Sequence, residues 1–229
     1  MLKRSVALLG AAVTLFTLFL FRDAVLATDS QPQGTVLLDE QFNDPKIDSR
    51  LRWLNPPPSS EVRDGWLTVM PGDRTDFWQK TLDGGSRDNG HFLYAEVSGD
   101  FVVETKVTGD VYNQYDQAGL LLHQDATHWV KVDAENDPVG TPTLGVVITR
   151  GTSDWSVSRR APQVYFLRLT RQGALVEVEA SADGRNWSIL RMATLAWNDR
   201  ARVGLFAACP TKSGMRARFD YLKIKRPAK

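Results

Sequence analysis

The chain has 229 residues, with 28 lysines and arginines against 27 aspartates and glutamates, so its formal net charge is +1. Such a balance, without a basic stripe, argues against nucleic acid as a partner, because phosphate binding needs clustered positive charge. The single cysteine, Cys209, excludes an internal disulfide, and its setting in VGLFAACP predicts a buried, unreactive thiol.

The first 27 residues have the pattern of a secretory signal peptide. Lys3 and Arg4 precede an apolar run, Val6–Phe21, and a small residue stands at the expected cleavage point, Ala27. The run is short for a membrane span, which needs about 20 apolar residues. We therefore expect cleavage and export to the periplasm or the extracellular space. The alternative is an uncleaved anchor through residues 5–21, which would then be the only contact with a membrane.

The rest of the chain divides into a polar linker, residues 28–34, and a single β domain, residues 35–229. Apolar residues in the domain recur with a period of two, which indicates strands. The runs are, in chain order, TVLLDEQF, GWLTVMP, DFVVETKVTG, AGLLLHQ, HWVKVDAE, LGVVITR, VYFLRLTRQG, LVEVEAS, ARVGLFAA and ARFDYLKIK. Between them, RQGA and SADGRNW predict hairpin turns, and the proline-rich LNPPPSSE, residues 54–61, predicts a surface loop.

No segment has a sustained helical period, so the pattern predicts an all-β fold. Short strands at regular spacing favour an antiparallel two-sheet jelly-roll sandwich. In such a sandwich the first and last runs, TVLLDEQF and RARFDYLKI, are expected to be neighbours.

The stretch YDQAGLLLHQDATHWVKVDAEND, residues 115–137, predicts a hairpin with an unusually polar face. Alternation along its second strand separates two sets of side chains. One set is Trp129, Lys131, Asp133 and Glu135; the other is Val130, Val132 and Ala134. We expect the valines in the core and the polar set on the outer face.

The register of this hairpin decides which residues of the first strand share that outer face. A turn with an even number of residues places Asp116 opposite Glu135, whereas a shift by one residue brings Gln117 and Gly119 over instead. The sequence leaves both registers open. In the even register the two carboxylates are about 5 Å apart, and Lys131 would offset their repulsion.

Carboxylates, an amide and a cation beside an indole ring suit a sugar, which offers hydroxyls for hydrogen bonds and an apolar face for stacking. RTDFWQKT and GTSDWSVS, the second on a predicted turn, are expected to form rims of the same groove. The candidate ligand-binding residues are Asp76, Trp78, Asp116, Gln117, Trp129, Lys131, Glu135, Asp154 and Trp155. The alternative is a solvated sheet face that carries charged pairs.

We expect neither a metal nor a cofactor, because His91, His123 and His128 have no ligand spacing. Six pieces in order, TDFWQKT, DNGHFLY, DFVVETKV, YDQAGLLLHQDATHWVKVDAE, VVITRGTSDWS and SADGRNWSILR, resemble the domain-of-unknown-function family 1349. The resemblance runs from about Leu51 to Ile224 and implies a concanavalin-A-like lectin/glucanase jelly roll. That superfamily includes carbohydrate binders, glycosidases and adhesion modules, so the fold does not choose among them.

The favoured function is non-catalytic binding of a carbohydrate or small polar ligand by an exported protein. A glycoside-active enzyme is the alternative, with Asp116 and Glu135 as its carboxylate pair. Against it, the Glu-x-Asp-x-x-Glu strand of laminarinase-type glucanases is incomplete here, because VKVDAEND lacks the first glutamate. A third possibility is an envelope interaction protein with a vestigial groove.

Overall fold

The computed structural model describes residues 34–110, 113–160 and 164–228. The predicted signal peptide and the linker before Gly34 lie outside these ranges. Within them the chain is all-β, with no helix, so none is available there to span a membrane.

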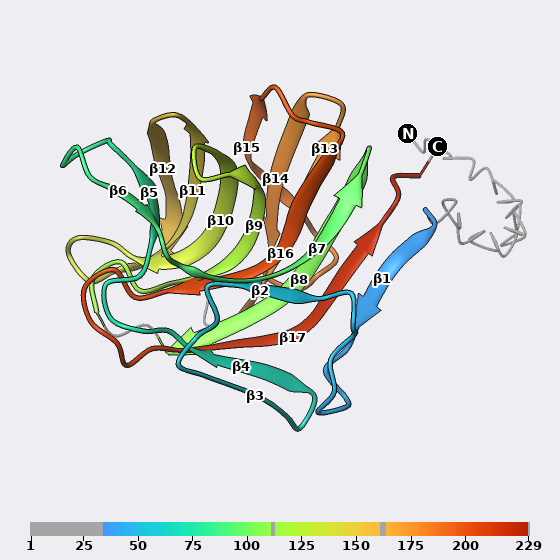
Figure 1. Ribbon diagram of the computed structural model, residues 1–229, viewed down its shortest axis with the longest axis horizontal. Helices are drawn as coiled ribbons and strands as arrows, with labels where there is room; N and C mark the ends of the chain where they lie inside the picture. Colours follow the sequence, from blue (N-terminus) through green and yellow to red (C-terminus); the bar gives the residue numbers. More distant parts are fainter. Residues whose placement is uncertain (1–33, 111–112, 161–163, 229) are drawn as a thin grey trace, which may run out of the picture. The chain divides into compact units, whose positions relative to one another are not determined.

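Two antiparallel sheets form a sandwich (Figure 1). The eight-stranded sheet has the order β15 (Ser188–Thr194), β14 (Leu175–Ser181), β13 (Val164–Gln172), β8 (Phe101–Asp110), β17 (Arg216–Lys225), β4 (Trp66–Met70) and β3 (Ser59–Arg63), with β1 (Val36–Glu40) also paired to β17. The seven-stranded sheet has the order β12 (Ser153–Arg160), β11 (Pro142–Arg150), β10 (His128–Asn136), β9 (Gln117–Asp125), β16 (Arg200–Ala208), β7 (His91–Ser98) and β2 (Arg52–Leu54). A separate hairpin joins β5 (Phe77–Gln79) to β6 (Ser86–Asp88).

The period-two pattern of the sequence accounts for most of this architecture. All ten predicted runs lie in strands, and the first and last of them pair as β1 and β17. The predicted turns also join hairpins, β13 to β14 and β14 to β15. One prediction needs correction: β3 starts at Ser59, inside the segment expected to be a loop. The prolines end at Pro58, and β3 is an edge strand, where sheets tolerate nearby proline.

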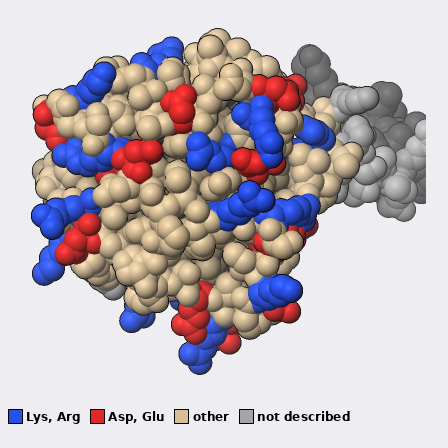
Figure 2. All heavy atoms as spheres, viewed as in Figure 1, with Lys and Arg blue, Asp and Glu red and all other residues tan. Residues whose placement is uncertain are grey.

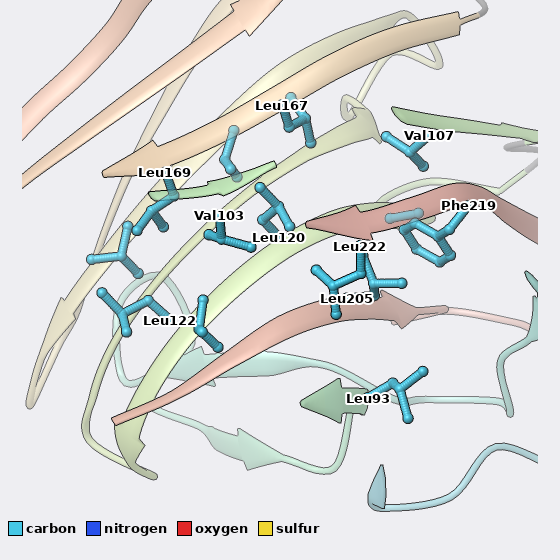
Figure 3. Close-up of a cluster of buried hydrophobic side chains, with 14 of the residues drawn as sticks. Leu93, Val103, Val107, Leu120, Leu122, Leu167, Leu169, Leu205, Phe219 and Leu222 are labelled. Carbon is cyan, nitrogen blue, oxygen red and sulfur yellow. The ribbon is translucent and has the colours of Figure 1, made fainter. Parts of the chain in front are cut away.

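The main core lies between the two sheets and explains which face of each strand turns inward. Side chains of both sheets interlock there, among them Leu120 and Leu122 of β9 and Val103 of β8 (Figure 3). Val130 and Val132 of β10 belong to the same core, as their alternation predicted. Each large apolar side chain fully buried in this way contributes about 1.5–3 kcal/mol to folding.

With its inner face in the core, β10 presents its polar set on the other side of the seven-stranded sheet. That outer face is therefore where a site can form. Elsewhere on the surface, acidic and basic side chains are interspersed over the face visible in Figure 2. Cys209 is buried and free, as predicted.

Candidate functional site

The β5–β6 hairpin covers part of the outer face of the seven-stranded sheet. Phe77 at its start is fully buried and meets Phe92, Trp129 and Phe206 edge-on, with ring centroids 6.2–6.4 Å apart. Gly90 permits this contact, because a Cβ there would lie 2.4 Å from the Phe77 ring. The hairpin thus seals one portion of the face with a second apolar cluster.

Trp129 lies inside this cluster with no exposed surface. Its indole N–H donates to the carbonyl of Ala126 at 3.2 Å. The prediction that Trp129 offers a stacking surface to a ligand is therefore wrong. The ring does lie on the expected face, but Phe77, far away in the sequence, covers it.

Hydrogen bonds fix the hairpin against the sheet beside the sealed portion. The Gln79 backbone N–H donates to the Ser153 hydroxyl at 2.9 Å, and the Gln79 amide donates to the Ala126 carbonyl at 2.8 Å. Next to these bonds a pocket of about 740 Å³ remains open. Its walls are formed by the hairpin, by strands β9 to β12 and by the loops after β10 and β16. The lining residues are Asp76, Trp78, Thr81, Leu82, Asp83, Arg87, Tyr115, Gln117, Lys131, Glu135, Pro138, Val147, Ser153, Asp154, Trp155, Pro210 and Thr211.

The observed register of the β9–β10 hairpin places Gln117, not Asp116, opposite Glu135. The strands begin with Asp125 paired to His128, but a bulge then pairs His123 with Trp129 and shifts the ladder by one residue. The even register, and with it the Asp116–Glu135 carboxylate pair, is therefore wrong. Asp116 is fully buried on the opposite side and does not line the pocket.

The floor of the pocket is a buried polar cluster around the Lys131 ammonium, which is only 2 % exposed. Lys131 Nζ donates to the Gln117 amide oxygen and, at 3.3 Å, to Asp76 Oδ1. Gln117 in turn donates to the same Asp76 oxygen at 3.3 Å. Burial alone would lower the pKa of Lys131, but attraction to Asp76, Asp133 and Glu135 outweighs it and raises the pKa. The neighbouring acids therefore favour the charged form of the lysine.

Two acids, Asp133 and Glu135, share the face of β10 next to this lysine. Both approach Gly145 of β11, where a Cβ would lie 2.9 Å from Asp133 Oδ1 and 2.9 Å from Glu135 Oε2. Burial raises the pKa of both groups, and repulsion from Asp133 raises that of Glu135 further. The side chains of Asp133 and Glu135 also lie within hydrogen-bonding range of each other, so a proton on one can be shared with the other. Burial and this repulsion therefore favour the protonated form of the pair.

Aromatic rings form the walls above this floor. Trp78 comes from the hairpin and Trp155 from β12, and Tyr115 meets Trp155 edge-on at 6.3 Å. The Trp78 indole N–H donates to the Thr81 carbonyl at 2.5 Å. The Trp155 indole N–H is buried and points toward the Glu135 carboxyl, so it is the ring of Trp155 that lines the pocket.

Most of the predicted ligand-binding residues meet in this pocket, although they come from four separate segments. They are Asp76, Trp78, Gln117, Lys131, Glu135, Asp154 and Trp155. Asp154 and Trp155 lie in β12 rather than on the predicted turn, and Asp154 is already paired with Arg191 at 2.9 Å. The sequence did not point to Tyr115 as a residue of the pocket wall. It placed Asp133 on the polar face of the strand but gave it no role in binding.

In the part of the chain that the structure describes, no group of three or more histidine, cysteine or acidic side chains could hold a metal ion. The site is instead an aromatic pocket with a charged, hydrogen-bonding floor on one sheet of a β-sandwich. Fold and site together define an all-β, two-sheet sandwich protein with a small-molecule-sized pocket.

The chain belongs to the family described as Protein of unknown function (DUF1349), whose model matches residues 53–227. It is 33 % identical over 177 residues to Regulation of enolase protein 1 of Saccharomyces cerevisiae, covering 76 % of this chain and 89 % of that one. A crystal structure of a functionally unknown protein from Saccharomyces cerevisiae has a TM-score of 0.75 and 32 % identity, covering 79 % of this chain and 98 % of that one.

The fold also resembles part of a larger enzyme. A xylan beta-1,4-xylosidase from Bacillus halodurans C-125 aligns with a TM-score of 0.66 and 18 % identity. The match covers 82 % of this chain but only 39 % of that chain. At this identity the likeness concerns the fold alone, a β-sandwich found in glycoside hydrolases.

Proposed function

We propose that this protein binds a neutral carbohydrate in the pocket between Trp78 and Trp155, without catalysing a reaction on it. The observation that carries the proposal is the combination of aromatic walls with a buried, hydrogen-bonding floor. The apolar face of a sugar ring can pack on an indole, and its hydroxyls can both donate and accept hydrogen bonds. A pocket of about 740 Å³ is within the usual range of small-molecule sites.

The floor has hydrogen-bonding capacity left for such a ligand. Lys131 has three N–H donors, and its hydrogen bonds to Asp76 and Gln117 use two of them. Asp76 Oδ2 takes no hydrogen bond from any described residue, so it can accept from a hydroxyl. The carboxyl of Glu135, with its raised pKa, adds a further donor.

The charges of the floor favour a neutral ligand over an anionic one. Asp76 compensates Lys131 directly, and Asp133 and Glu135 add two further acids nearby. An anionic sugar would meet more acids than cations here. We infer that the pocket selects hydroxyl-rich, uncharged rings.

A glycosidase needs two carboxyls on either side of the scissile bond, about 5–5.5 Å apart for retention or 6.5–9.5 Å for inversion. The pair expected for that role, Asp116 and Glu135, is divided between the two faces of the sheet. Asp133 and Glu135 lie side by side on one strand and converge on Gly145. This arrangement suits a shared proton better than attack from two sides, and for that reason we favour binding over catalysis.

Titration calorimetry with a panel of neutral oligosaccharides, including xylo-oligosaccharides, tests the proposal. We expect binding in the millimolar to micromolar range, about 4–8 kcal/mol. Trp155→Ala should weaken it by about tenfold or more, since lost stacking and apolar burial together exceed about 1.4 kcal/mol. Trp187→Ala is the matched control, because Trp187 packs on Arg168 away from the pocket.

The outcomes separate the candidate functions. No binding by any neutral glycan, or equal binding by the Trp155 and Trp187 variants, would reject the proposal. Release of reducing ends from the same panel, abolished by Glu135→Gln, would establish the glycosidase instead.

We also propose that the protein acts outside the cytoplasm, on the strength of the signal-peptide pattern in residues 1–27. Amino-terminal sequencing of the protein recovered from cell fractions tests this directly. A mature chain that starts near Thr28 in an exported fraction supports export, whereas an intact Met1 in the cytoplasmic fraction contradicts it.

A further inference from the structure

A second cavity, of about 340 Å³, lies at the other edge of the seven-stranded sheet. It forms where β1 and the end of β17 face β7. Edge strand β2 pairs only with Phe92–Tyr94 of β7, so residues 95–98 continue beyond it. This gap in the edge opens a cleft between the two sheets.

Arginines dominate the cleft. Arg50, Arg52, Arg200 and Arg226 line it, and Glu96 is the only acid among its lining residues. The whole chain, by comparison, carries a formal net charge of only +1. The cleft therefore concentrates positive charge on an otherwise balanced surface.

Two of these arginines have no carboxylate partner among the described residues. Arg50 pairs with Asp48 and Arg200 with Glu96, but no acid in the described ranges forms an ion pair with Arg52 or Arg226. Arg226 is nevertheless held in place, since its Nη1 donates to the carbonyls of Ser98 at 2.6 Å and Asp100 at 2.8 Å. These two backbone carbonyls position the guanidinium group, but they are neutral and do not offset its positive charge.

We infer that this cleft binds the phosphoryl or sulfo group of a second ligand, separately from the aromatic pocket. Guanidinium groups recognise such oxyanions through paired, charge-assisted hydrogen bonds. The two positive charges of Arg52 and Arg226 match the charge of a dianion better than the single charge of a carboxylate. Leu38 and Ile224 form apolar wall next to them, so a small carbon skeleton can accompany the anionic group.

The probe is inorganic phosphate, with sulfate as a second anion, titrated at low ionic strength and followed by calorimetry. Chloride at matched ionic strength serves as the control for screening. We expect saturable phosphate binding that weakens as salt is added. Arg52→Gln should reduce the affinity by about tenfold, because a charge-assisted hydrogen bond contributes roughly 1.5–3 kcal/mol. Arg63→Gln removes the same charge at the β3–β4 turn and should leave the affinity unchanged.

A second variant protects the test against misfolding. Arg52→Lys keeps the charge but loses the paired donors, and it should bind phosphate more weakly than the unaltered protein. Vesicles of phosphatidylcholine with and without phosphatidic acid distinguish a lipid headgroup from a soluble ligand. Binding of phosphate, of phosphatidic acid vesicles or of both supports the inference, provided that it depends on Arg52. Binding of neither, or affinities equal in the Arg52 and Arg63 variants, overturns it.

Discussion

Replacing Lys131 with methionine removes the buried cation from the floor of the aromatic pocket while keeping roughly the length of the side chain. Asp76 would lose its ion pair at 3.3 Å, and Gln117 would lose a donor to its amide oxygen. Breaking a buried pair by removing one partner costs about 3–5 kcal/mol, because the other charge stays buried. That is a large part of the roughly 5–15 kcal/mol by which a domain is stable.

The loss should depend on pH in a defined direction. At neutral and higher pH the acids near Lys131 either stay charged without compensation or take up protons at a cost. At acidic pH they are protonated in both the folded and the unfolded chain, so the variant should recover much of its deficit.

Urea denaturation followed by tryptophan fluorescence at about pH 3 and about pH 8, below and above the ordinary pKa range of carboxyl groups, measures both effects. Lys223→Met is the matched control, since Lys223 pairs with Asp39 on the surface and should change stability by about 1 kcal/mol or less. A deficit of Lys131→Met below about 1 kcal/mol, or one equal at both pH values, would refute the reasoning.

Three further predictions follow from the packing and the acid pair. Phe77→Ala should lower the free energy of unfolding by about 3–5 kcal/mol in the same assay, because it opens a cavity over Trp129, and a smaller loss would mean that the hairpin does not seal the sheet. Burial raises the pKa of Glu135, so the folded protein holds a proton that the unfolded chain releases, and stability should fall as pH rises above the ordinary glutamate range. Glu135→Gln should flatten that decline, and an unchanged slope would contradict the raised pKa. Burial also raises the pKa of the Cys209 thiol to about 12, so a disulfide reagent should label it only on unfolding. Rapid labelling of the native protein would count against this burial.

The sequence predicted the sandwich because most strands have one face in the core. Strands that do not meet this condition were not predicted from the alternation of apolar residues. In β7, His91, Phe92 and Leu93 are buried in succession, so the alternation disappears. Strand β15 is an edge strand with largely exposed residues, and it has little apolar pattern to detect.

Most of the residues that line the pocket were predicted to lie together, but their geometry was not. Alternation along β10 correctly grouped Lys131 with Glu135, which is a local property of a strand. The bulge near Gln124 is also local, but no glycine or proline marks it, so the register could not be read. The covering of Trp129 by Phe77 depends on a contact between distant segments, which the pattern of either segment does not encode.

The indole N–H signals of the seven tryptophans in a ¹H–¹⁵N NMR spectrum, followed as a neutral oligosaccharide is added, test the central claim most directly. The N–H signals of Trp155 and Trp78 should shift strongly, because both rings line the pocket, while that of the buried Trp129 stays nearly unchanged. Shifts confined to Trp66 and Trp187, or no shifts at saturating sugar, would contradict binding in this pocket.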